Sequence, residues 1–112
     1  MLVVDNETIE TDFEGYLFHP DDWSIAACKL MAIDEALELD DEYWEIIFFM
    51  RKWYDEHKVA PDTRHTIKFM RDNFETSKKI AHNRLFELFP FGYVKQACKI
   101  AGMKKPRAWS SG

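Results

Sequence analysis

Cys98 is the residue in this sequence best suited to covalent chemistry. It follows Lys95-Gln96-Ala97 and precedes Lys99, in a stretch that predicts a short helix near the C-terminus. A cysteine reacts as its thiolate, and nearby lysines lower the thiol pKa by favouring that anion. A thiol close to the end of a chain can be carried to a partner. The segment therefore suits the transfer of sulfur between proteins.

An α-helical projection of residues 92–103 places Cys98 at the boundary between an apolar face and solvent. Tyr93, Ala97 and Ile100 form the apolar face, and Lys95 lies beside Cys98 on the polar side. The helix dipole opposes the lysines because Cys98 lies nearer the C-terminal end, so we expect a modest net pKa shift. A lone helical cysteine is also common as a packing residue, and the residues alone leave both interpretations open.

The other candidate groups favour structural roles. Cys28 lies between Ala27 and Lys29 in a helical stretch with apolar neighbours, so we expect it in the core or at its boundary. The histidines lack the short spacings to cysteine or carboxylate that zinc sites use, and neither a phosphate loop nor a nucleophile elbow occurs. The sequence predicts neither a metal site nor a cofactor. The four histidines are His19, His57, His65 and His82.

Length and composition predict one globular domain. The 112 residues are 46% hydrophobic and include only two cysteines. A chain of this size can bury a modest core, and two cysteines without a signal peptide suggest reduced thiols in a cytoplasmic protein. No apolar run approaches the ~20 residues that cross a bilayer, so no membrane segment is expected.

Charge is distributed unevenly along the chain. Residues 1–60 contain 16 acidic residues and four Lys or Arg, whereas residues 61–112 contain four acidic residues and 11 Lys or Arg. Such a split favours either a basic face that meets an acidic partner or nucleic acid, or a solvated basic surface.

The elements that must position Cys98 are mostly helical. Residues 3–11 alternate around Asp5-Asn6 and predict a β-hairpin, followed by a second turn at Asp12 to Gly15. Pro90 and Gly92 bracket the turn into the last helix, and Gly102 is its expected C-cap. The predicted helices span residues 23–36, 41–57, 61–74, 77–88 and 92–103.

The first of these helices is expected to be capped by Asp21 or Asp22. Its apolar face is predicted to comprise Trp23, Ala26, Ala27, Leu30 and Ile33. The predicted fold is mainly α with a small N-terminal β-hairpin: a compact five-helix bundle with a helix-turn-helix-like element. Residues 1–103 form a single domain, and residues 104–112 form a flexible C-terminal arm.

Several segments of the sequence, in the same order along the chain, match the sequence pattern of a known protein family. They are Glu14-Gly15-Tyr16-Leu17, Asp22-Trp23, Leu37-Glu38-Leu39, Tyr43-Trp44-Glu45-Ile46-Ile47, Tyr54 through Ala60-Pro61 with Arg64, Leu88-Phe89-Pro90, Lys95-Gln96-Ala97-Cys98 and Ala101-Gly102-Met103-Lys104-Lys105-Pro106. With these segments the chain resembles the DsrC/TusE family of sulfur-relay proteins over nearly its whole length. The resemblance implies the same fold, a hairpin on a helical bundle with a flexible C-terminal arm.

The resemblance also implies a function. TusE-type members relay persulfide sulfur toward 2-thiouridine at the tRNA wobble position, between a donor sulfurtransferase complex and a tRNA-thiolating enzyme. DsrC-type members work with dissimilatory sulfite reductase and use a second cysteine on the arm. Trp109 occupies that position here, so the two-cysteine arm chemistry does not carry over. Cys98 is the candidate sulfur-bearing thiol. The residues expected to support the persulfide or to dock partners are Lys95, Lys99, Lys104, Lys105, Arg107 and Trp109.

Two further functions compete with sulfur carriage. The chain could be a docking or regulatory protein without covalent chemistry, anchored in a partner by Trp109 and steered by the basic arm. It could instead bind nucleic acid through the helix-turn-helix-like element, although its overall acidity weighs against this. The basic residues of that element are Arg64, Lys68, Arg71, Lys78, Lys79 and Arg84.

Overall fold

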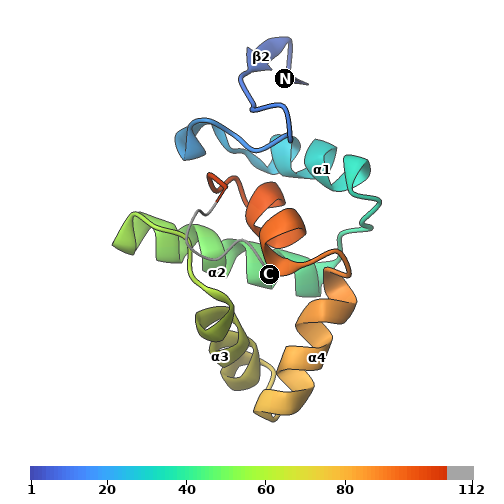
Figure 1. Cartoon of the computed structure of the whole chain (residues 1–112), viewed down its shortest axis with the longest axis vertical. Coiled ribbons are helices and arrows are strands. Elements are labelled where there is room, and N and C mark those ends of the chain that lie inside the picture. The colour runs from blue at the N-terminus through green and yellow to red at the C-terminus, as the bar shows by residue number, and fades with distance from the viewer. Residues whose placement is uncertain (106–112) are drawn as a thin grey trace.

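A computed structural model describes residues 1–105 of the chain. A two-stranded hairpin precedes a set of helices, in the order β1 (Leu2–Val4), β2 (Glu7–Ile9), the 3₁₀ turn η1 (Pro20–Asp22), α1 (Ile25–Asp34), α2 (Asp41–His57), α3 (Thr63–Asn73), α4 (Lys78–Leu88) and the π-helix η2 (Tyr93–Cys98). Figure 1 shows the hairpin and α1 at one end of the long axis, α3 and α4 at the other, and α2 across the middle. The predicted mainly helical bundle with an N-terminal hairpin is confirmed.

The hairpin forms where the alternation predicted it. β1 and β2 are antiparallel, with Leu2 opposite Ile9. Asp5 and Asn6 have φ values of 50° and 69°, as the tight turn of a two-residue hairpin requires. The next turn carries Tyr16 and Leu17 into the core, and an isolated bridge joins Thr11 to Leu17.

Side-chain caps fix the starts of the four α-helices. Asp40 accepts hydrogen bonds from the backbone at the start of α2, Asp62 does so for α3, and Ser77 does so for α4. The predicted helix starts at residues 41, 61 and 77 lie within two residues of the observed starts of α2, α3 and α4. In each case a side-chain oxygen satisfies a backbone N–H that has no partner within the helix. α3 and α4 are consecutive and pack together as the predicted helix-turn-helix-like element.

Two expectations for α1 were wrong. Ser24, not Asp21 or Asp22, caps α1, because the chain first makes the separate 3₁₀ turn at Pro20–Asp22. The buried face was also misplaced, since Ile33 is 71% exposed whereas Met31 is buried. α1 is apolar on most of its circumference, and its hydrophobic pattern therefore does not select one face.

The C-terminal segment lies at the centre of the molecule. Nearly every residue from Tyr93 to Met103 is buried, and the exceptions are Lys95 and Lys99. Around them lie large buried side chains of α2, α3 and α4, including Ile46, Met70 and Leu85. Within residues 1–105, the helices lack the combination of length and apolar character that crossing a bilayer requires.

Candidate functional site

The helix that carries Cys98 is positioned by side chains that reach it from distant parts of the sequence. Each donates a hydrogen bond to a backbone carbonyl, which satisfies a buried acceptor and fixes the helix against the bundle. The bonds are Tyr16 Oη to the Val94 carbonyl at 3.0 Å, Trp23 Nε1 to Ile100 at 2.8 Å and Arg51 Nη1 to Ala101 at 3.1 Å.

Arg51 connects three segments at this point. Its second terminal nitrogen donates to the Pro20 carbonyl at 3.0 Å, and its guanidinium lies 4.7 Å from the centre of the Trp23 ring. A planar guanidinium can stack on an aromatic ring while its N–H groups donate hydrogen bonds in its own plane. Arg51 therefore joins the 3₁₀ turn, α2 and the C-terminal segment in one contact.

Gly102 ends this segment as predicted. Its φ is +79°, its N–H donates to Lys99, and the Met103 N–H donates to the Cys98 carbonyl. This pair of bonds defines a Schellman motif, in which glycine adopts the left-handed conformation at low cost. A Cβ atom at Gly102 would lie 2.4 Å from the Trp23 ring, so the site also requires glycine for space.

Cys98 is not at the core boundary, as the helical projection predicted, but is 0% exposed. Residues 93–98 form a π-helix, whose i→i+5 hydrogen bonds turn the chain less per residue than an α-helix does. The α-helical projection therefore placed Cys98 too far from the apolar face. π-Helical turns are rare and often occur at functional sites.

The thiol pKa also differs from the expectation of a modest shift. Burial raises the pKa of Cys98 well above its ordinary value, and a hydrogen bond with Tyr93 offsets part of that rise. Burial penalises the charged thiolate more than nearby lysines favour it. In this closed arrangement Cys98 is a protonated thiol at neutral pH.

Tyr93 and Thr66 belong to the surroundings of Cys98, and the sequence analysis assigned neither a role there. The Tyr93 hydroxyl donates to the Pro61 carbonyl at 2.7 Å and lies 2.8 Å from the Thr66 hydroxyl. Burial raises the pKa of Tyr93 well above its usual value, so the phenol is neutral. The one sequence signal for this role of Thr66 was its place next to Ile67 on the buried face of α3.

Within residues 1–105, two of the four predicted lysines make ion pairs with carboxylates. Lys99 makes an ion pair with Glu35 at 2.8 Å and lies 5.6 Å from the centre of the Tyr16 ring. Lys105 pairs with Glu14 at 2.8 Å. Lys95 and Lys104 are exposed. The remaining predicted site residues, Arg107 and Trp109, lie outside the described residues, as does the rest of the predicted flexible arm.

The fold and the site define a class of protein: a small helical domain that holds one thiol on a central C-terminal helix and continues into a basic segment. Comparisons identify the family within this class. Residues 3–108 match the model of the family described as "DsrC like protein". The chain belongs to this DsrC-like family.

Curated relatives and solved structures agree with this assignment. The chain is 41% identical over 106 residues to "Sulfurtransferase TusE" of Salmonella typhi, an alignment that covers 95% of this chain and 96% of that protein. It is 38% identical over 107 residues to "Sulfurtransferase TusE homolog" of Haemophilus influenzae, covering 95% and 96% of the two chains.

Its fold matches the NMR structure of DsrC from Allochromatium vinosum with a TM-score of 0.83, 37% identity and coverage of 96% of this chain and 95% of that one. It also matches the oxidized gamma-subunit of the dissimilatory sulfite reductase (DsrC) from Archaeoglobus fulgidus with a TM-score of 0.81, 28% identity and coverage of 94% and 95%. Sequence and structure therefore agree on a sulfur-relay protein of the DsrC/TusE type.

Proposed function

We propose that this protein carries sulfur as a persulfide on Cys98. The observation that carries the proposal is the position of Cys98 on a π-helical turn, seven residues before the predicted partner-docking residue Lys105, in a DsrC-like fold. Cys28 lies elsewhere, on α1, and both thiols are buried with raised pKa values, so burial does not distinguish them. Cys98 is the better candidate of the two because it lies in the C-terminal segment that precedes the basic arm.

The transfer would be an exchange without net oxidation. The Cys98 thiolate attacks the terminal sulfur of a donor persulfide, a new S–S bond forms at Cys98, and the donor's S–S bond breaks. The donor leaves as a thiolate and takes up a proton, while the Cys98 proton passes to solvent. Because the thiol is buried and protonated in the closed form, docking of the donor must first expose it.

The turn that contains Glu14 and Tyr16 is the segment best placed to open. Tyr16 contacts the Cys98 helix through the Val94 carbonyl, and Glu14 holds Lys105 by an exposed ion pair. Exposed ion pairs contribute at most about 1 kcal/mol, so a partner that competes for Lys105 can release it. After opening, Lys95 and Lys99 would stabilise the persulfide anion, and Lys104, Lys105, Arg107 and Trp109 would dock the partner.

The names of the relatives suggest the partners. We propose a sulfurtransferase donor complex and a sulfur-accepting enzyme, either a tRNA-thiolating enzyme that makes wobble 2-thiouridine or a sulfite reductase-like enzyme, acting in the cytoplasm. Direct nucleic-acid binding receives less support. Four of the six basic residues of the α3–α4 element make ion pairs with carboxylates: Arg64, Lys68, Arg71 and Arg84.

Sulfur loading is tested by intact-protein mass spectrometry after incubation with a persulfide-loaded donor sulfurtransferase, which can dock and expose the buried thiol. The wild type and Cys28→Ser are expected to gain the mass of one sulfur atom, and Cys98→Ser is expected to gain none. Cys28→Ser is a matched control because both thiols are 0% exposed. Loading on Cys28, or equal loading of all variants, would contradict the assignment of Cys98.

One observation favours a second function. A buried thiol with a raised pKa is also what a structural cysteine shows, and this suits a docking or regulatory protein without sulfur transfer. Under this alternative no variant gains sulfur, even with a protein donor. Trp109→Ala then weakens binding to the donor complex, whereas Cys98→Ala leaves it unchanged.

A further inference from the structure

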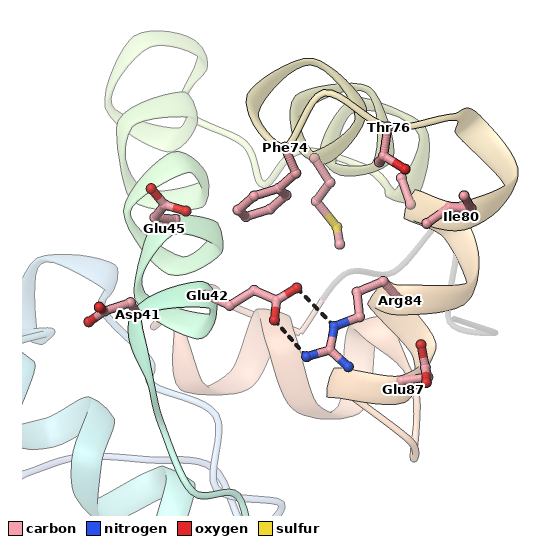
Figure 2. Close-up of a pocket in the computed structure, with 10 residues that line it drawn as sticks. Asp41, Glu42, Glu45, Phe74, Thr76, Ile80, Arg84 and Glu87 are labelled. Atoms are coloured by element: carbon pink, nitrogen blue, oxygen red, sulfur yellow. Dashed lines mark hydrogen bonds and ion pairs between the residues drawn. The ribbon is translucent and has the colours of Figure 1, made fainter.

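A pocket of about 550 Å³ is lined by α2, α3, α4 and the connection between α3 and α4. Figure 1 shows the α3–α4 pair on the side of α2 away from the hairpin. Figure 2 shows side chains that line it: Phe74 follows α3, Ile80, Arg84 and Glu87 come from α4, and the other carboxylates come from α2. Its volume lies in the range of ~300–1,000 Å³ typical of ligand pockets. The Cys98 site does not use these residues.

The floor of this pocket is apolar and partly open. Met70 and Ala81 are buried beneath it, Phe74 is half-buried, and Ile80 is 60% exposed at its edge. An apolar side chain that entered here would bury both its own surface and that of Ile80. Each Å² of apolar surface removed from water stabilises the bound state by ~25 cal/mol. The pocket is therefore suited to a large apolar anchor.

The rim of the pocket is acidic. Four carboxylates and one guanidinium line it, and the guanidinium of Arg84 is already bound by both Glu42 oxygens, at 2.9 and 2.6 Å. Asp41, Glu45 and Glu87 remain as exposed carboxylates around the apolar floor (Figure 2). Such a rim favours cationic groups on either side of an apolar anchor.

The chain itself contains a segment with this chemistry. Residues 104–112 carry three cations, Lys104, Lys105 and Arg107, next to one large aromatic residue, Trp109, and no carboxylate side chain. Arg and Trp are among the residues that most often dominate binding energy at protein interfaces. The segment complements the pocket in charge and in its single apolar anchor.

The ion pair of Lys105 favours a pocket occupant from a second copy of the chain over the segment of the same molecule. Lys105 is tied to Glu14, which follows the hairpin, whereas the pocket is lined by α2 and the α3–α4 pair. Figure 1 shows the hairpin and the α3–α4 pair on opposite sides of α2. Trp109 follows Lys105 by four residues, a reach of at most ~14 Å. This short reach limits where the same molecule's segment can bind, whereas a segment from another molecule enters from solvent without that limit.

We propose that the pocket lined by Phe74, Ile80 and the α2 carboxylates binds the 104–112 segment of a second copy of this chain. Trp109 occupies the apolar floor, and Arg107 meets the carboxylates Asp41, Glu45 and Glu87, while Lys105 keeps its ion pair with Glu14. Self-association of this kind occupies the arm that the proposed function assigns to partner docking. Self-association and partner docking therefore exclude one another.

The test is sedimentation equilibrium of the full chain over a series of concentrations, with a reductant present to prevent disulfide dimers. The wild type is expected to associate reversibly, and raising the salt concentration weakens that association. Trp109→Ala and Ile80→Lys are each expected to weaken it at least about tenfold, because each removes one half of the contact. A mixture of these two variants is expected to form heterodimers, since one supplies an intact pocket and the other an intact segment.

Matched controls separate this contact from other causes. Ile33→Lys makes the same substitution at an isoleucine of α1 that is 71% exposed, and Cys98→Ser removes the proposed sulfur carrier. Neither is expected to change association, so failure of sulfur loading and failure of this proposal are distinguishable. A wild type that stays monomeric at every concentration overturns the proposal, whether its pocket is empty or holds its own segment. Equal weakening by Ile33→Lys and Ile80→Lys also overturns it.

Discussion

Replacing Gly102 with alanine is expected to lower the free energy of unfolding by about 3 kcal/mol. The new Cβ atom would lie 2.4 Å from the Trp23 ring, and the residue would have to keep a φ of +79°. A left-handed conformation costs a non-glycine residue roughly 1–2 kcal/mol, and overpacking in a core costs a further ~1–3 kcal/mol. Urea unfolding followed by tryptophan fluorescence measures the change.

Gly15→Ala is the matched control for this prediction. Gly15 also has a positive φ, +95°, but its added Cβ atom would meet only the end of the flexible Lys99 side chain, at 2.9 Å. The lysine can move, so the expected cost is the backbone strain alone, about 1–2 kcal/mol. If both variants lose the same stability, the contact with Trp23 does not determine the requirement for glycine at 102.

Raising the pH from 8 to 10 is expected to destabilise the folded chain by about 3 kcal/mol. Burial raises the pKa of Cys28 to about 12 and also raises the pKa of Cys98. The unfolded chain loses both thiol protons near pH 8.5, whereas the folded chain retains them, so the unfolded state gains stability as the pH rises. The thiol contribution is fully present below pH 8.5 and is lost progressively toward pH 12.

Urea unfolding at a series of pH values up to 10 measures this dependence. Cys98→Ala and Cys28→Ala are each expected to remove about half of it, and the double variant nearly all. Tyr16, whose pKa is raised by burial to about 12, contributes mainly above pH 10, because an unfolded tyrosine ionises near ~10. A double variant with the wild-type pH dependence would show that the thiols are not its cause.

Local signals in the sequence were sufficient for much of the fold. Asp5-Asn6 identified the hairpin because both residues tolerate positive φ. The predicted start of the third helix at residue 61 lies two residues before α3, which Asp62 caps. Gly102 marked the end of the last helix because glycine readily adopts the positive φ found there. Each of these features depends on a few neighbouring residues, which a sequence displays directly.

The surroundings of Cys98 could not be predicted in this way. The hydrogen-bond pattern of residues 93–98 is π-helical, and a projection at the α-helical angle therefore assigned Cys98 to the wrong face. The partners of the segment are also remote: Thr66 lies on α3 and Tyr16 follows the hairpin. Which lysine meets which carboxylate, as in Lys99 with Glu35, depends on tertiary packing that spacing does not encode.

The central position of the Cys98 helix has a consequence for the order of folding. The hydrogen bonds that hold it join residues 78, 77 and 50 positions apart, in the pairs Tyr16–Val94, Trp23–Ile100 and Arg51–Ala101. Helical proteins with mostly local contacts fold fast, whereas contacts of such high sequence separation require large loops to close first. We therefore expect the hairpin and the α3–α4 pair to form before this helix docks. Until docking, the Cys98 thiol is open to solvent at its ordinary acidity, so the newly folding chain is the most reactive form of the protein.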